Sequence, residues 1–435
     1  MRMLATSSPN VHLAPPFVQR RLVNGLTVIV EERHTTPVAA VNLWYDVGSR
    51  HEADHQKGLA HLFEHLMFQG SRNVAAGEHA GVLESVGARF NATTSFDRTN
   101  YFETVPVNAL STALWLEADR MATLREALSE QEFEAQRDVV KNERLQTYVE
   151  VPYGESMTHL MAALLPAGHP YATLPIGDMA HLDAATLEDL RSFFDTHYAP
   201  DNAVLTVVGD VDPENVFARA EEFFGGIPAG RPPAATPVDV LPPLSDGPTT
   251  TVVARVPYPA VFRGWRIPAL TDDAFLAFEI AARVLGQGNG SRLRSGLVRE
   301  QSLAIDVQAY AMGLAAGNSV LGVNAFVAEG VAPERVVDAV DEHIAQMLDR
   351  GLTDDEFASA VARHERDVVE AMSTSGGRAD ALSGAHTIHG DAARADQVLD
   401  RLRTLTAEAV VEALQSWLTP LASATVVYQP PTEEG

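Results

Sequence analysis

The sequence of 435 residues has no cysteine, few basic side chains and no long apolar run. Without cysteine, disulfides and thiolate metal sites are excluded, so any metal ligand must be histidine, aspartate or glutamate. The 32 basic and 58 acidic side chains give a formal charge of −26. That charge argues against nucleic acid as a partner, because phosphate contact requires a basic face. It favours basic or neutral polypeptides instead.

The sequence pattern also lacks a membrane span and a secretion signal. No apolar run approaches the ~20 residues that cross a bilayer, so we expect no membrane partner. Met1 to Thr6 contain no apolar core of a signal peptide. This predicts a cytoplasmic protein, or a periplasmic one if a leader was removed. A chain of this length is expected to form two or more domains.

Three polar side chains interrupt an otherwise apolar stretch from Gly58 to Phe68. His61, Glu64 and His65 are three and four residues apart, so on a helix they share one face, and the apolar remainder predicts a buried helix. Burying two imidazoles and a carboxylate is costly unless they bind something. Histidines at i and i+4 can share one zinc, and the intervening glutamate can take a proton from water. The order His-x-x-Glu-His is the inverted form of the zinc-peptidase signature.

A second histidine pair spells the more familiar order His-Glu-x-x-His, from His51 to His55. That motif functions on a buried helix, whereas the segment between Gly48 and Gly58 is polar and bounded by glycines. The composition predicts a solvated loop. We therefore expect His51 and His55 to take no part in the chemistry.

The chain reads as two similar halves joined by a proline-rich linker. Seven prolines lie from Pro228 to Pro248, which predicts an extended linker at 229–249 between halves at 17–228 and 250–430. The hexapeptide that begins at Leu128 recurs in similar form at Leu352, a shift of 224 positions (352 minus 128). We interpret the repeat as an internal duplication. The metal motif is not duplicated, because the same shift places Leu285, Gly288 and Asn289 opposite His61, Glu64 and His65.

Strand patterns followed by helix patterns predict an α+β fold of two homologous halves, each an antiparallel-rich sheet with helices packed on one face. The expected strands include 26–30, 39–45, 88–94 and 99–105, and the expected helices include 109–124, 130–146, 272–285, 333–349 and 354–372.

A catalytic zinc usually takes three protein ligands and leaves one position for water. The expected helix 130–146 offers several carboxylates, most of which must be on its solvated face. Asp138 and Glu143 are the main candidates, and periodicity prefers Glu143 only slightly.

The segment His61-Leu-Phe-Glu64-His65, followed by Val139-Val-Lys-Asn-Glu143, resembles the pitrilysin family of inverzincin zinc metallopeptidases. That family includes insulin-degrading enzyme and the mitochondrial processing peptidase. Further matching segments are 48–50, 68–71, 90–92, 198–202 and 290–293, and the resemblance extends from about Arg21 to Tyr428. It implies one zinc per chain, bound by His61, His65 and Glu143, with Glu64 as the general base.

The same resemblance implies two further roles. Asn91 and Ala92 would belong to an edge strand that binds the backbone of a short or unfolded peptide by β-addition. Gln136 stands where the family usually has a glutamate that supports the metal site. Exchanges of such supporting groups commonly alter metal affinity or activity by ~10–100-fold.

The family also places an arginine and a tyrosine, seven residues apart, in the zinc-free half. The aligned positions here are Val298 and Ile305, neither of which can donate a hydrogen bond to a developing oxyanion. Arg299 or Tyr310 could substitute only through local rearrangement. We therefore expect the zinc-bearing subunit of a heterodimer whose homologous, zinc-free partner supplies the pair, similar to the mitochondrial processing peptidase. The alternative is a non-catalytic scaffold subunit, like the core proteins of respiratory complexes.

Overall fold

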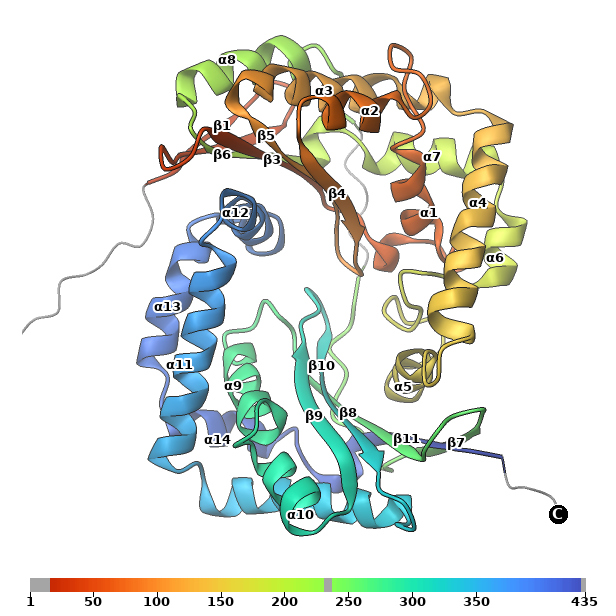
Figure 1. Cartoon of the computed structure of the whole chain (residues 1–435), viewed down its shortest axis with the longest axis vertical. Coiled ribbons are helices and arrows are strands. Elements are labelled where there is room, and N and C mark those ends of the chain that lie inside the picture. Colours follow the sequence, from red (N-terminus) through yellow and green to blue (C-terminus); the bar gives the residue numbers. More distant parts are fainter. Residues whose placement is uncertain (1–15, 231–236, 432–435) are drawn as a thin grey trace, which may run out of the picture.

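The computed structural model describes residues 16–230 and 237–431 and contains two mixed layers of sheet and helix, one above the other in Figure 1. The expected α+β fold is confirmed. Part of the expected linker 229–249 lies outside the described residues, as do the first residues, on which the expectation of no secretion signal depends. Among the described residues, no helix has the length and apolar character needed to cross a bilayer.

The first sheet has six strands in the order β1-β2-β6-β3-β5-β4, and every neighbouring pair is antiparallel except β2 and β6. The strands are β1 (Val18–Arg21), β2 (Thr27–Glu32), β3 (Val38–Tyr45), β4 (Arg89–Thr94), β5 (Thr99–Pro106) and β6 (Ala203–Gly209). The second sheet has the order β7-β11-β8-β10-β9, and only β7 and β11 are parallel. Its strands are β7 (Thr249–Val253), β8 (Ala260–Pro268), β9 (Ala304–Met312), β10 (Asn318–Val327) and β11 (Ser423–Gln429). The two orders correspond strand by strand from β2 and β7 onward, as a duplication requires.

The helices of the two halves correspond only in part. The first half contains α1 (Leu59–Leu66), α2 (Glu78–Ser85), α3 (Leu110–Ala127), α4 (Glu130–Arg144), α5 (Ser156–Leu164), α6 (Met179–Ala184), α7 (Leu187–His197) and α8 (Pro213–Phe224). The second half contains α9 (Phe275–Gly286), α10 (Pro333–Arg350), α11 (Asp354–Ala371), α12 (Ser375–His389), α13 (Arg394–Thr404) and α14 (Ala407–Gln415). The expected helix 130–146 ends as an α-helix at Arg144 and continues as a π-helical turn, Leu145–Val149.

The central strand β3 is buried on both faces, because successive side chains of a strand point to opposite sides. Val41, Leu43 and Tyr45 belong to the large core that also contains α1, whereas Ala40 and Trp44 belong to a smaller core under α12. Its apolar composition therefore reflects two covering layers.

The two halves exchange a helix. Helix α12 of the second half packs on β3 and β6 of the first sheet, and α5 of the first half packs on β8 and β11 of the second sheet (Figure 1). A fully buried Arg378 on α12 forms ion pairs with Glu31 of β2 at 2.8 Å and Asp396 of α13 at 2.7 Å. A Cβ on Gly264 of β8 would come within 2.9 Å of Leu164, so the glycine lets α5 approach the second sheet.

Candidate metal centre

Helix α1 begins where a buried carboxylate caps it. Glu52 is 5% exposed and accepts hydrogen bonds from the backbone N–H of Gly58 at 3.0 Å and of Ala60 at 2.7 Å. These N–H groups have no partner within the helix, so the side-chain oxygens of Glu52 satisfy them. Burial raises the pKa of Glu52 to about 8, and the amides and Lys57 oppose that rise.

The expectation of a solvated segment at His51 to His55 is therefore wrong in part. His55 is exposed, as expected, but Glu52 is buried and His51 is largely shielded. The Nδ1 atom of His51 accepts a hydrogen bond from the N–H of Gly48 at 3.0 Å, and burial lowers the pKa of His51 to about 3. Glu52 lies six residues before the N-cap Gly58, so the usual capping signals of a sequence do not reveal it.

The apolar positions of α1 fix which of its faces remains open. Leu59, Ala60, Leu62, Phe63 and Leu66 are buried in the large core. The Phe63 ring lies 4.3 Å from the ring of Tyr198, centre to centre. The remaining face carries His61, Glu64 and His65, and it turns toward α4.

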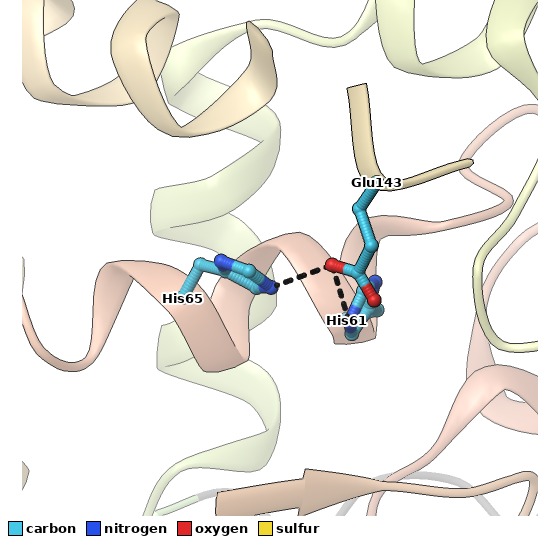
Figure 2. A group of neighbouring side chains, drawn as sticks. All are labelled: His61, His65 and Glu143. Carbon is cyan, nitrogen blue, oxygen red and sulfur yellow. Dashed lines mark ion pairs between the residues drawn. The ribbon is translucent and has the colours of Figure 1, made fainter. Parts of the chain in front are cut away.

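Figure 2 shows Glu143 reaching from α4 toward both imidazoles of α1. Its Oε2 atom lies 3.7 Å from Nε2 of His61 and 3.4 Å from Nε2 of His65. Among the described residues, these three form the one group whose potential ligand atoms all lie within 4.8 Å of one another. Asp138, the other candidate on α4, is exposed and outside the group.

The protonation states suit a metal site. Burial lowers the pKa of His61 to about 4, and the neighbouring His65 adds to this. Burial also lowers the pKa of His65, while Glu143 and a hydrogen bond with Gln136 act in the opposite direction. Metal ligands must be neutral imidazoles and ionised carboxylates. Two neutral imidazoles and one carboxylate match the donor set of a catalytic zinc.

Glu64 lies beside this group and is held by a strand of the first sheet. The Thr94 hydroxyl donates a hydrogen bond to Oε2 of Glu64 at 2.5 Å. Burial raises the pKa of Glu64, the Thr94 hydroxyl and Arg98 lower it, and Glu143 raises it further. A carboxyl group whose pKa is raised toward neutrality is suited to accept and return a proton.

The other expected residues lie around the group. Gln136 is on α4, two helical turns before Glu143, and acts to raise the pKa of the nearby His65. Asn91 is exposed and Ala92 is buried on β4, which is the edge strand of the first sheet. An edge strand presents unpaired backbone groups to an added strand.

The two positions in the second half at which we expected no hydrogen-bond donor are occupied by Val298 and Ile305. Val298 packs against the core of the second half, and Ile305 is 47% exposed on the edge strand β9. Arg299 is exposed and bonded to Ser295, while the Tyr310 hydroxyl is buried. Among the described residues, neither Arg299 nor Tyr310 has a hydrogen bond or ion pair with the metal-centre side chains. Leu285 ends α9, and Gly288 and Asn289 follow it in a loop.

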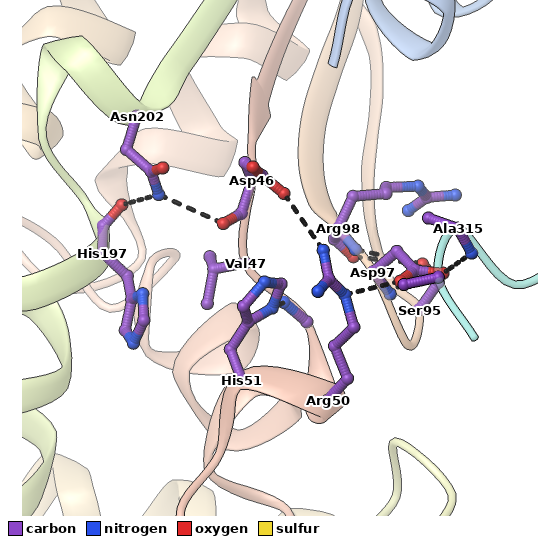
Figure 3. A network of polar contacts seen from close by, with 12 residues as sticks. Asp46, Val47, Arg50, His51, Ser95, Asp97, Arg98, His197, Asn202 and Ala315 are labelled. Atoms are coloured by element: carbon purple, nitrogen blue, oxygen red, sulfur yellow. Dashed lines mark hydrogen bonds and ion pairs between the residues drawn. The ribbon is translucent and has the colours of Figure 1, made fainter. Parts of the chain in front are cut away.

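Sequence reasoning missed a polar network around Arg50 and Asp97, shown in Figure 3. Asp97, in the β4–β5 turn, pairs with Arg50 at 2.7 Å and accepts hydrogen bonds from the Tyr171 hydroxyl at 2.5 Å and the N–H of Ala315 at 3.0 Å. Ala315 belongs to the loop between β9 and β10 of the second half. No sequence motif indicates this network, because its residues are far apart in the sequence and come into contact only in the folded chain.

Two family models match successive parts of the chain. The model described as "Insulinase (Peptidase family M16)" matches residues 27–164, and the one described as "Peptidase M16 inactive domain" matches residues 184–363. The zinc protease PqqE of Helicobacter pylori is 32% identical over 354 residues, 80% of this chain and 78% of that protein. A probable mitochondrial-processing peptidase subunit beta of Arabidopsis thaliana is 29% identical over 276 residues, 63% of this chain and 48% of that protein.

Solved structures share the fold along almost the whole chain. The crystal structure of a protease from Helicobacter pylori has a TM-score of 0.88 and 28% identity, covering 96% of this chain and 100% of that one. A chain of complex III2 from Candida albicans has a TM-score of 0.79 and 14% identity, covering 94% and 95%. The second likeness concerns the fold alone.

Proposed function

Because the chain belongs to peptidase family M16, we propose that it is a zinc-dependent endopeptidase whose metal ligands are His61, His65 and Glu143. The single observation that carries the proposal is the convergence of these three side chains from two helices, with ligand atoms within 4.8 Å of one another. When bound, zinc would make a water molecule acidic enough to lose a proton near neutral pH.

The residues of the chain would then act as follows. Glu64 accepts the proton of the attacking water and returns it to the leaving amine. Gln136, on the same helix as Glu143, supports the metal site from beside His65. Asn91 and Ala92 on the edge strand β4 pair with an extended substrate backbone, so the substrate is a short or unfolded peptide. The catalytic half is assigned to 17–228 and the zinc-free half to 250–430, with 229–249 as the linker.

We propose further that turnover requires a homologous, zinc-free partner subunit. Two observations support this: the apolar Val298 and Ile305 stand where an arginine and a tyrosine are needed, and one relative is named as a subunit of a processing peptidase. The partner supplies hydrogen-bond donors to the oxyanion that develops on the substrate carbonyl.

A scaffold role without catalysis is the second candidate, favoured by the apolar side chains of Val298 and Ile305. The two candidates differ in metal content. A scaffold has no need of two neutral imidazoles and a carboxylate in one group, whereas a peptidase binds about one zinc per chain.

The test combines metal analysis with a matched pair of variants. We expect about one zinc per chain after zinc-replete purification, and hydrolysis of unstructured peptides by the chain together with a homologue that copurifies with it. Glu64→Gln should keep the zinc and abolish hydrolysis, whereas Glu134→Gln, an exposed change on α4, should keep both. Absence of zinc would favour the scaffold, and full activity of the isolated chain would remove the need for a partner.

A further inference from the structure

The β4–β5 hairpin holds Glu64 by one hydroxyl group. Thr94, the last residue of β4, donates to Oε2 of Glu64 at 2.5 Å. Its neighbour across the hairpin is Thr99, whose hydroxyl lies 3.4 Å from that of Thr94 and donates to the carbonyl of Val47 at 2.9 Å. The Thr94 hydroxyl is thus fixed between a second hydroxyl and the carboxylate.

This single contact determines which oxygen of Glu64 remains available. Among the described residues, Oε2 has a donor in Thr94 and Oε1 has none. A carboxylate oxygen that already accepts a hydrogen bond is the poorer proton acceptor of the two. Thr94 therefore leaves Oε1 as the oxygen that can take a proton from water.

The turn of the hairpin is clamped from two sides. On the first side, Ser49 and Arg50 donate their backbone N–H groups to the carbonyls of Ser95 at 3.1 Å and Phe96 at 3.0 Å. A Cβ on Gly48 would come within 2.4 Å of the Ser95 carbonyl oxygen, so only glycine allows this approach.

On the second side, Asp97 ties the turn to the other half of the molecule (Figure 3). The Ala315 N–H donates to Asp97 at 3.0 Å. The Tyr171 hydroxyl donates to Asp97 at 2.5 Å and accepts from the N–H of Ala316 at 3.2 Å. Asp97 is 8% exposed and Tyr171 is fully buried. Asp97 thus accepts two hydrogen bonds and pairs with Arg50 at 2.7 Å, which fixes the turn against both halves.

We propose that Thr94 is a positioning residue that orients the Glu64 carboxylate, and that Asp97 makes this orientation depend on docking of the second half. The inference rests on the proposed function and adds to it two residues and a coupling between the halves.

The first experiment compares Thr94→Val, Thr94→Ser and the exposed control Thr404→Val in the zinc-loaded protein with its partner. We expect Thr94→Val to lower kcat by about 10–100-fold with KM and zinc content unchanged. Thr94→Ser should restore most of kcat because it restores the hydroxyl, and Thr404→Val should match the wild type. Unchanged kcat in Thr94→Val, or no recovery in Thr94→Ser, would overturn the inference.

Crystal structures of the wild type and Thr94→Val separate this inference from the proposed function, because they need no turnover. We expect the Glu64 carboxylate to rotate away from its wild-type position in the variant. An unmoved carboxylate would refute the role of Thr94 even if the protein is a peptidase. A wild type without zinc or hydrolysis would instead refute the proposed function, while the rotation still reports on Thr94.

The coupling through Asp97 is tested with Asp97→Asn and the milder Tyr171→Phe, against the surface control Asp195→Asn. Both network variants should lower kcat by about ten-fold with zinc retained, since small misplacements of reacting groups are costly. The double variant should be no slower than the worse single variant, because both changes break one network. Additive losses, or wild-type kcat in both single variants, would show that the halves are not coupled to Glu64.

Discussion

Replacing Arg378 with methionine should release the exchanged helix α12 from the first sheet. The Arg378 side chain is fully buried and pairs with Glu31, which is also fully buried, and with Asp396, which is 46% exposed. Methionine keeps the apolar stem of the side chain and removes only its charge. The variant therefore isolates the ion pairs from the packing of α12.

The expected loss of stability in this variant depends on the partners that Glu31 keeps. Removing one member of a buried ion pair costs about 3–5 kcal/mol, because the other charge is left without compensation. Glu31 keeps a second partner in Arg33 at 2.7 Å, which places the cost near the lower end, at about 3 kcal/mol. The lost pair with Asp396 adds little, because exposed ion pairs contribute at most about 1 kcal/mol.

Hydrogen exchange read by mass spectrometry is the suitable assay, because a chain of this size need not unfold in one step. A loss of about 3 kcal/mol corresponds to roughly 100-fold faster exchange of the amides of α12. Arg403→Met removes an exposed arginine from α13 and should leave α12 unchanged. Unaltered protection of α12 in Arg378→Met, or equal acceleration throughout the protein, would refute the reasoning.

Three further predictions concern Gln136 beside the metal centre, Glu52 at the start of α1 and the partly buried Glu279. Gln136→Glu should tighten zinc binding by about 10–100-fold, measured by competition with a chelator, whereas the exposed Gln131→Glu should not; equal affinities would mean that the group beside His65 does not support the metal. Glu52→Ala should lower the free energy of unfolding by about 1–2 kcal/mol through loss of the α1 cap, and normal exchange of the α1 amides would contradict this. Burial raises the pKa of Glu279 to about 7, so the folded state binds its proton more tightly than the unfolded state. Stability should therefore fall as pH rises from about 4.5 to 7 and stay lower above it, while Glu279→Gln should remove up to about 3 kcal/mol of that loss; parallel stability curves for the two proteins would disprove it.

The elements with strong local signals could be predicted from the sequence. The repeated hexapeptide at Leu128 and Leu352 contains a helix cap in each copy, because Ser129 accepts from the N–H of Glu132 and Thr353 from that of Glu356. Helix α10 begins at Pro333, which is favoured at a first helical position. Such signals depend only on residues close together in the sequence, so they can be recognised without knowledge of the tertiary structure.

For the candidate site, the sequence predicts the shared helical face but not the packing around it. The spacing of His61, Glu64 and His65 defines one helical face whatever lies opposite. Choosing Glu143 over Asp138 needed more, because both are on one helix and only the packing of α4 on α1 separates them. Thr94 and Asp97 escaped prediction, since their partners are distant in sequence and neither belongs to a recognisable pattern.

The exchange of helices left no pattern in the sequence either. Helix α12 is rich in glycine and alanine and carries an arginine on its buried side, which resembles neither an amphipathic surface helix nor an apolar core helix. It packs on β3 and β6 and pairs through Arg378 with Glu31 of β2, all of which belong to the other half of the molecule.

The crossed placement of α5 and α12 means that the proline-rich segment is not a seam along which the protein can be divided. A fragment ending there would lack the cover over Ile29, Ala40 and Trp44 and would present a broad apolar sheet surface to solvent, a hazard for self-association. A protease cut within the segment should, by contrast, leave both pieces bound as one particle. Each half of the duplicated chain therefore supplies a helix that covers the sheet of the other half.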